Sequence, residues 1–274
     1  ERMLELLKGY EFIKSNEEDF ASANELEDPK YEATLIGRRV AQLYLDPLTA
    51  DHIIKCIKRG RERQLVEFSF LQMVSYTLEM RPLLKVRTAE YDDVQEKIVL
   101  FNSNILMLEP SVYESEYDEF LASVKSALFL TDWVDENDEE FLLEKYAIRP
   151  GEVRVKIDNA NWLLFAAEEL TKLLGYKEIL KELIKLRLRL KYGVKEELLT
   201  LLRLKNIGRV RARKMFNNRI RTVKDLKECD VIELAQLIGK KVAIDVKKQV
   251  GIDVSNIKIK ENKRKGQISL RDYW

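Results

Sequence analysis

Two copies of one short pattern in the C-terminal third of the chain have the residue types expected of a phosphate-binding turn. Residues 207–212 are Ile-Gly-Arg-Val-Arg-Ala, and residues 238–243 are Ile-Gly-Lys-Lys-Val-Ala. The apolar residue anchors the turn, and the glycine (Gly208 or Gly239) lets the backbone approach a phosphate where the next helix begins. The alanine keeps the paired helices in close contact. We therefore predict a tandem helix-hairpin-helix domain over residues 195–255.

The chemistry of this domain is the binding of nucleic-acid phosphates. The first copy has Asn206 where the pattern commonly has glycine, and Asn tolerates a positive φ better than most residues. The alternative is a helical hairpin whose basic face is merely solvated. A doubled motif among basic side chains favours phosphate binding. Besides the two glycines, the predicted DNA-binding residues here are Arg209, Arg211, Arg213, Lys214, Lys240 and Lys241, and Arg203 and Lys205 lie near the first turn.

The last eight residues form a second motif, Q-x-x-h-x-x-a-a, by which proteins bind a sliding clamp. In one tight helical turn Leu270, Tyr273 and Trp274 fall on one side, with Gln267 beside them. The segment before them, residues 256–266, is basic and has no core-forming period, which predicts a flexible tether. The alternative is a frayed terminus that carries two aromatic residues by chance.

Trp162 is the third candidate. On the helix predicted from about residue 151 to 174, it points nearly opposite to the apolar stripe, on the side of Asp158, Asn159 and Glu169. A Trp on a polar face can stack on a base. Since bundle helices can be covered on two sides, core packing is an equal alternative.

No pattern for catalysis or for metal binding is visible. A GxxxxGK[ST] phosphate loop is missing, and His52 has no companions at metal-ligand spacing. Cys56 and Cys229 stand far apart, which predicts plain buried or half-buried thiols in a reducing cytoplasm rather than zinc ligands. We expect no active site, no metal and no cofactor within these residues.

Charge divides the chain. The net charge is +1, but residues 1–176 hold 21 Lys and Arg against 35 Asp and Glu, whereas residues 177–265 hold 26 against 11. The second part should attract a phosphate backbone and the first should repel it. Charged residues make up 35% of the chain, which would suit a thermophile. No apolar run is long enough to cross a membrane.

The elements that must position these residues are mainly α-helices, because ten Gly and five Pro leave long stretches with a 3.6-residue apolar period. Residues 10–13 and 31–35 alternate like two short strands between helices at 3–9 and 35–45, which predicts the C-terminal part of a winged helix over residues 1–47. Residues 48–194 should form a helical bundle. A flexible tail, residues 256–274, follows the helix-hairpin-helix domain. Without an initiator Met, the sequence should start inside a longer protein.

Four segments in this order resemble the region after the motor of the archaeal Hjm helicases, superfamily-two DNA repair enzymes akin to animal HELQ. The segments are LIGRRVAQLYLDPLTA (35–50), MRPLLKVRTAEYDD (80–93), EKYAIRPGEVR (144–154) and KYGVKEELLTLLRLKNIGRVRARKMFN (191–217). The likeness covers nearly the whole chain, and its last segment is the most specific.

This resemblance implies a role for each part of the chain. Two RecA-like motor domains using ATP and Mg would precede a winged helix, a bundle with a long "ratchet" helix, and the helix-hairpin-helix domain. Trp162 matches the ratchet-helix Trp that stacks on a base. Val155 stands where the family has Arg, so Arg154 and Lys156 are the candidates for that cationic contact. Arg209, Arg211 and Arg213 match a basic motif that holds the departing single strand.

The resulting prediction is the non-motor C-terminal portion of a 3′–5′ helicase acting on forked or branched DNA in repair and recombination. Its expected partners are single-stranded and forked DNA, the upstream motor and the sliding clamp PCNA, and its expected location is the cytoplasm, associated with the nucleoid. Two alternatives remain: a stand-alone structure-specific DNA-binding adaptor, and a winged-helix transcription regulator.

Overall fold

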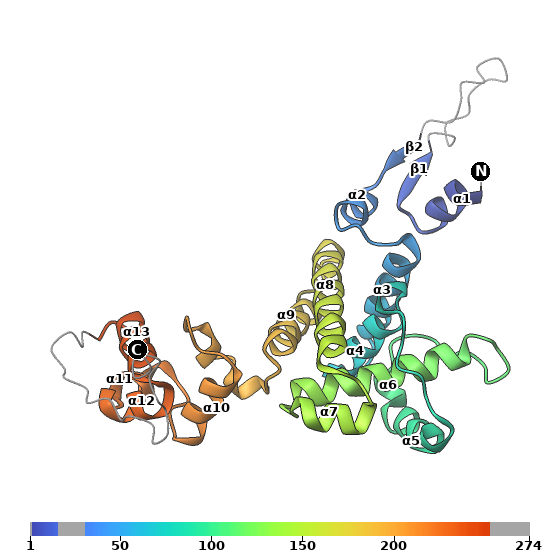
Figure 1. Cartoon of the computed structure of the whole chain (residues 1–274). Coiled ribbons are helices and arrows are strands. Elements are labelled where there is room, and N and C mark those ends of the chain that lie inside the picture. The colour runs from blue at the N-terminus through green and yellow to red at the C-terminus, as the bar shows by residue number, and fades with distance from the viewer. Residues whose placement is uncertain (1, 16–30, 253–274) are drawn as a thin grey trace, which may run out of the picture. The chain divides into compact units, whose positions relative to one another are not determined.

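The computed structural model describes residues 2–15 and 31–252. It consists of two compact units, residues 1–193 and 194–274, which we describe separately. Helices account for most of the described residues of both units, so the expectation of a mainly α protein is confirmed (Figure 1). Within the described ranges, no helix is both long and apolar enough to span a membrane.

The first unit begins with a small helix, hairpin and helix. Helix α1 is Arg2–Gly9, the antiparallel strands β1 and β2 are Ile13–Ser15 and Tyr31–Ala33, and α2 is Leu35–Gln42. In the hairpin, Ile13 pairs with Ala33.

Two contacts fix α2 against this hairpin. The Thr34 hydroxyl accepts a hydrogen bond from Gly37 N (3.0 Å) and so caps the helix. A Cβ at Gly37 would lie 2.0 Å from the carbonyl oxygen of Phe12. Only glycine allows α2 to lie so close to the hairpin.

Two boundaries of these elements differ from those predicted from the sequence. We expected the first strand at residues 10–13, but Phe12 N donates to Leu7 O (2.9 Å), which closes α1 with a turn and moves the strand to Ile13–Ser15. The helix expected to reach residue 45 ends at Gln42. Tyr44 there adopts φ +55°, which the helix cannot continue.

The bundle follows. Its α-helices are α3 (Pro47–Gly60), α4 (Glu67–Ser75), α5 (Tyr91–Phe101), α6 (Tyr117–Val134), α7 (Glu139–Tyr146), α8 (Pro150–Leu174) and α9 (Lys177–Tyr192). Three 3₁₀ turns interrupt them: η1 (Leu78–Met80), η2 (Thr88–Glu90) and η3 (Asn102–Asn104). Helix α8 begins with Pro150 at its first position and ends at Leu174, because the next residue, Gly175, has a φ of +78°. It packs against α3 on one side and α9 on another (Figure 1).

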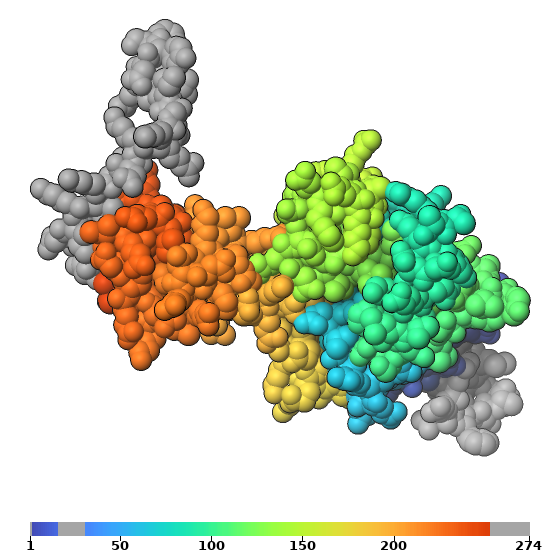
Figure 2. Space-filling model, turned by 90° about the horizontal axis from the view of Figure 1, so that it is seen from below, coloured from blue at the N-terminus to red at the C-terminus, as the bar shows by residue number. Residues whose placement is uncertain are grey.

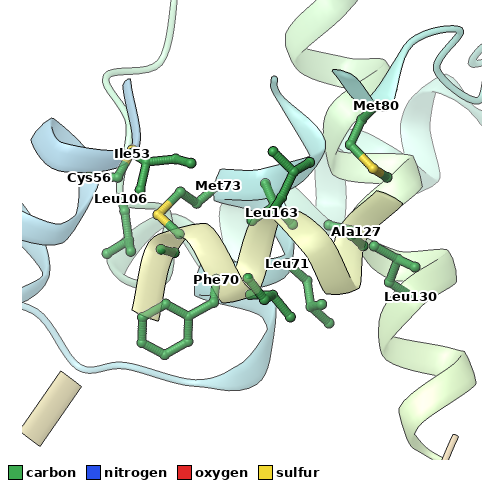
Figure 3. Packing of buried hydrophobic residues seen from close by; sticks show 14 of the residues in the cluster. Ile53, Cys56, Phe70, Leu71, Met73, Met80, Leu106, Ala127, Leu130 and Leu163 are labelled. Carbon is green, nitrogen blue, oxygen red and sulfur yellow. The ribbon is translucent and has the colours of Figure 1, made fainter. Parts of the chain in front are cut away.

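One apolar core joins the N-terminal hairpin and its helices to the bundle. Phe12 and Val40 belong to the same buried cluster as the bundle helices. Figure 3 shows its centre, where Phe70, Leu71 and Met73 of α4 lie among side chains of α3, α6 and α8. The assignment of residues 1–47 to a winged helix remains a prediction.

The second unit contains η4 (Glu196–Leu198), η5 (Leu201–Arg203), α10 (Arg209–Asn217), α11 (Val223–Glu228), α12 (Val231–Ile238) and α13 (Lys240–Gln249). Its described residues form one closely packed body, orange to red in Figure 2. Ala212 and Ala243 are both fully buried, as expected for helices in close contact.

Candidate nucleic-acid interface

The first hairpin turn, residues 204–208, joins η5 to α10. Ile207 is buried and anchors the turn, and Asn206 adopts φ +66°, the left-handed conformation that its residue type permits. Gly208 precedes α10 in extended backbone, and a Cβ added there would meet nothing within 4 Å. Gly208 thus leaves open space at the surface, where a phosphate could approach the backbone.

The start of α10 is suited to an anion. The helical hydrogen-bond ladder begins with Ala212 N donating to Gly208 O (2.9 Å), so the N–H groups of residues 209–211 precede it. The positive end of the helix dipole lies at the same place. Backbone donors, dipole and arginine side chains are therefore brought together at one helix end, which is the arrangement that binds phosphate.

The three predicted arginines differ in their surroundings. Arg211 is exposed, and its Nη1 donates to Asn206 O (2.9 Å), so it also supports the turn. Arg213 pairs with Glu197 (2.7 Å), and its guanidinium lies 5.2 Å from the centre of the Phe216 ring. Arg209 is partly exposed at the first position of α10. Lys214, also predicted, is exposed on the same helix.

The second copy of the motif has a different backbone. Helix α12 ends at Ile238, α13 begins at Lys240, and Gly239 alone separates them with φ +92° and ψ +144°. Lys240 is partly exposed and Lys241 is exposed at the start of α13. The two copies share their residue pattern, but only the first has a turn of several residues.

On α8, Trp162 is half-buried and packs against the core of the first unit. It nevertheless lies on the most exposed stripe of the helix, at helical spacing from Val155 (58% exposed) and Phe165 (37% exposed). The Trp162 side chain therefore has both a packed part and an accessible part. A role in base stacking remains a prediction.

Polar neighbours of Trp162 connect α8 to other elements. Glu169 forms an ion pair with Arg39 of α2, and Asn159 Nδ2 donates to the carbonyl oxygen of Glu79 in η1 (3.1 Å). The carboxylate of Glu79 accepts hydrogen bonds from Asp46 N (3.3 Å) and from the Thr49 hydroxyl (2.6 Å). Contacts from both α2 and η1 thus fix the helix that carries Trp162.

The two candidate cations beside Val155 differ in their exposure to solvent. Arg154 is highly exposed and pairs with Asp158 one turn later (2.9 Å). Lys156, in contrast, is 8% exposed, and its ammonium donates to the carbonyl oxygens of Met80 (2.6 Å) and Pro82. The expectation that Lys156 presents a charge to DNA does not fit this geometry, because the ammonium already binds two backbone acceptors inside the protein.

A second aromatic residue that the sequence analysis did not single out, Phe165, lies on the same exposed stripe of α8. Its ring lies 5.3 Å from the guanidinium carbon of Arg187 on α9, and it follows Trp162 by three residues. An aromatic residue at that spacing on the same helix could have indicated it. The predicted clamp-binding residues Gln267, Leu270, Tyr273 and Trp274 lie outside the described residues.

The other residues that the sequence analysis considered, Cys56, Cys229 and His52, are buried or half-buried. Cys56 is buried and Cys229 half-buried, as expected of plain thiols. Burial raises the pKa of Cys56 to about 12 and lowers the pKa of His52, which bonds to the carbonyl oxygen of Met73 (3.0 Å). Within residues 2–15 and 31–252, no three His, Cys, Asp or Glu side chains gather where they could hold a metal ion.

Comparison with known proteins gives two family matches. A model described as archaeal helicase, domain 4, matches residues 68–193, and one described as a SAM-like helix-hairpin-helix tandem matches residues 198–250. The boundary between the matches agrees with the boundary between the two structural units.

Three curated relatives carry the name ATP-dependent DNA helicase Hel308. The protein of Methanocaldococcus jannaschii is 34% identical over 82% of this chain and 18% of its own length. Those of Methanococcus vannielii and Thermococcus kodakarensis are 36% and 35% identical, over 77% and 87% of this chain and 28% and 21% of their own lengths. The chain spans less than a third of each of these relatives. The chain is thus similar to the C-terminal region of archaeal Hel308-type superfamily-two DNA helicases.

Proposed function

We propose that this chain guides single-stranded DNA for a 3′–5′ helicase that acts on forked or branched DNA in repair and recombination. The observation that carries the proposal is the first hairpin, where an open Gly208, the start of α10 and Arg209, Arg211 and Arg213 converge. Helix ends with basic side chains bind phosphates without regard to base sequence, as a translocating machine requires.

Trp162 serves as a second contact in this proposal. Its accessible part would stack on a base, and the exposed Arg154 would approach the neighbouring phosphate from the same helix. Lys156 is not part of the proposed contact, because it is buried. The exposed stripe of α8 then provides a surface past which a strand can move.

The other parts of the proposal concern residues and domains beyond those described. ATP and Mg would be bound by upstream RecA-like motor domains; the relatives' name, ATP-dependent DNA helicase, supports the use of ATP. The motif Gln267, Leu270, Tyr273 and Trp274 would tether the protein to the sliding clamp PCNA. The protein would work in the cytoplasm, on the nucleoid.

Affinity for a labelled single strand, measured by fluorescence anisotropy at several salt concentrations, tests the proposal. Replacing Arg209, Arg211 and Arg213 by Ala should weaken binding and flatten its salt dependence, by about 0.7 in the slope for each phosphate that is no longer neutralised. A matched control removes three other positive charges of the same unit, Arg219, Lys224 and Lys227, and should change binding less. Equal effects of both triple variants would contradict a specific site at the first hairpin.

A further inference from the structure

The first hairpin turn is held by side chains of the last helix, far away in the sequence. Gln249 on α13 pairs with the backbone of Lys205 in both directions: Lys205 N donates to Gln249 Oε1 (2.8 Å), and Gln249 Nε2 donates to Lys205 O (3.3 Å). One turn earlier, Asp245 Oδ2 accepts from Asn206 Nδ2 (2.9 Å) and from Gln249 Nε2 (3.0 Å). We call Asn206, Asp245 and Gln249 the clasp.

Within the clasp, Asp245 and Gln249 hold the turn at Asn206, the residue with a positive φ, and at Lys205 directly before it. Asn206 holds φ +66°, a left-handed conformation that few residue types other than Gly and Asn adopt readily and that local hydrogen bonds support. Its side chain is bound to Asp245, and its carbonyl oxygen accepts from Arg211 Nη1 (2.9 Å). The path from Lys205 to Gly208, which sets where α10 begins, is therefore fixed from α13.

Asp245 carries a negative charge, which is unexpected beside a turn that binds phosphate. A carboxylate within the phosphate-binding unit should repel DNA, and yet here it binds two neutral amides that hold the turn. Asp245 and Gln249 lie on α13, the helix that begins within the second copy of the motif and continues beyond residue 243. Its sequence pattern matches the first copy and its glycine is equally open, but the single residue Gly239 connects α12 to α13, where the first copy has a turn of five residues.

We propose that Asp245 and Gln249 are positioning residues for the first hairpin, and that the second motif copy serves chiefly to hold the phosphate-binding turn of the first. This inference rests on the proposed DNA binding. It assigns different tasks to two copies that are alike in sequence.

The test uses the whole chain and the same salt-series anisotropy assay. Asp245→Asn keeps an oxygen acceptor and removes the charge, so binding should be unchanged or up to about twofold tighter. Asp245→Ala removes both, and binding should become about three- to tenfold weaker despite the removal of a negative charge. Gln249→Ala changes no charge and should weaken binding to a similar extent. In all three variants the salt slope should stay that of the wild type, because every cation that neutralises a phosphate is still present.

A matched control removes another acidic charge of the unit, Glu233, which is exposed in the first turn of α12. Glu233→Ala should behave like Asp245→Asn. If Asp245→Ala also tightens binding, the carboxylate acts only through its charge and the inference fails. Asn206→Gly, which keeps the positive φ without the side-chain bond, should weaken binding less than Asp245→Ala.

Hydrogen exchange separates positioning from a loss of fold. Amides of residues 204–208 should exchange faster in Asp245→Ala and Gln249→Ala but not in Asp245→Asn, while α10 to α13 keep their protection. If the triple arginine variant binds like the wild type, the proposed function itself fails. If that variant weakens binding while Asp245→Ala and Gln249→Ala bind normally, only the inference of positioning fails.

Discussion

The ammonium nitrogen of Lys156 lies 2.6 Å from the carbonyl oxygen of Met80, so a charged side chain inside the first unit joins α8 to η1. The same group donates to Pro82, and its surroundings lower its pKa from the ordinary value of 10.5 because burial disfavours the charge. The contact lies six residues before Trp162 on the helix proposed to touch DNA.

Replacing Lys156 by Met should reduce the free energy of unfolding at neutral pH by about 1–3 kcal/mol, because the buried carbonyl group of Met80 and the part-buried one of Pro82 lose a charged donor. The wild-type protein should also gain stability as the pH rises from the lowered folded pKa towards 10.5, since the unfolded chain binds more protons in that window. Lys156→Met should lack this gain. Urea unfolding of both proteins at pH 8 and pH 10.5 measures how far their free energies of unfolding differ at each pH. If this difference is the same at both pH values, burial does not lower the pKa of Lys156.

Trp162→Ala should weaken binding of single-stranded DNA by about 1–3 kcal/mol, whereas Trp162→Phe should keep most of the affinity because a ring remains for stacking. Phe165→Ala tests whether Phe165, three residues after Trp162, also contributes to DNA binding. Trp133, whose Nε1 donates to Leu190 O (2.7 Å), serves as an internal reference, since its fluorescence should not be quenched by DNA. If Trp162→Ala only lowers the melting temperature and binds DNA normally, Trp162 is a core residue.

The ion pair between Arg39 and Glu169 should couple α2 to α8. A double-mutant cycle with Arg39→Ala and Glu169→Ala should give a coupling energy of about 0.5–1 kcal/mol, because both side chains are partly shielded from water. Hydrogen exchange should show α2 losing protection in either single variant. A coupling energy of zero, with α2 unchanged, would mean that apolar contacts alone hold this helix.

Deleting residues 267–274 should abolish capture of the chain by an immobilised sliding clamp and leave DNA affinity unchanged. Tyr273→Ala with Trp274→Ala should have the same effect, because these side chains would fill the apolar pocket of the clamp. Asp272→Ala, on the polar side of the expected turn, is the matched control and should be captured normally. Capture that survives the deletion would place clamp binding elsewhere.

Local residue types predicted much of the candidate site. The spacing of Ile, Gly and Ala identified both hairpins, and the conformational tolerance of Asn predicted the positive φ of Asn206. These features depend on neighbours in the sequence, so the pattern contains them. Mainly helical structure followed in the same way from the apolar period.

Contacts between distant segments could not be predicted. Lys156 was expected to reach solvent, but the two carbonyl groups that bind it lie 76 and 74 residues earlier in the chain. Gln249 pairs with a backbone 44 residues away, and nothing in the helical period of α13 distinguishes it from a solvated residue. The different connections at Gly208 and Gly239 were equally hidden, because both glycines follow an isoleucine and precede a basic residue.

The hydrogen bonds of Glu79 limit where a label or an inserted peptide can be attached to this protein. Its carboxylate binds the start of α3, 33 and 30 residues earlier, and its carbonyl oxygen binds Asn159, 80 residues later. Opening this short turn should therefore expose three segments in one step, as a single unit of hydrogen exchange. A fluorophore or an inserted peptide at η1 would disturb the α8 surface indirectly, so reporters of strand movement are better attached elsewhere.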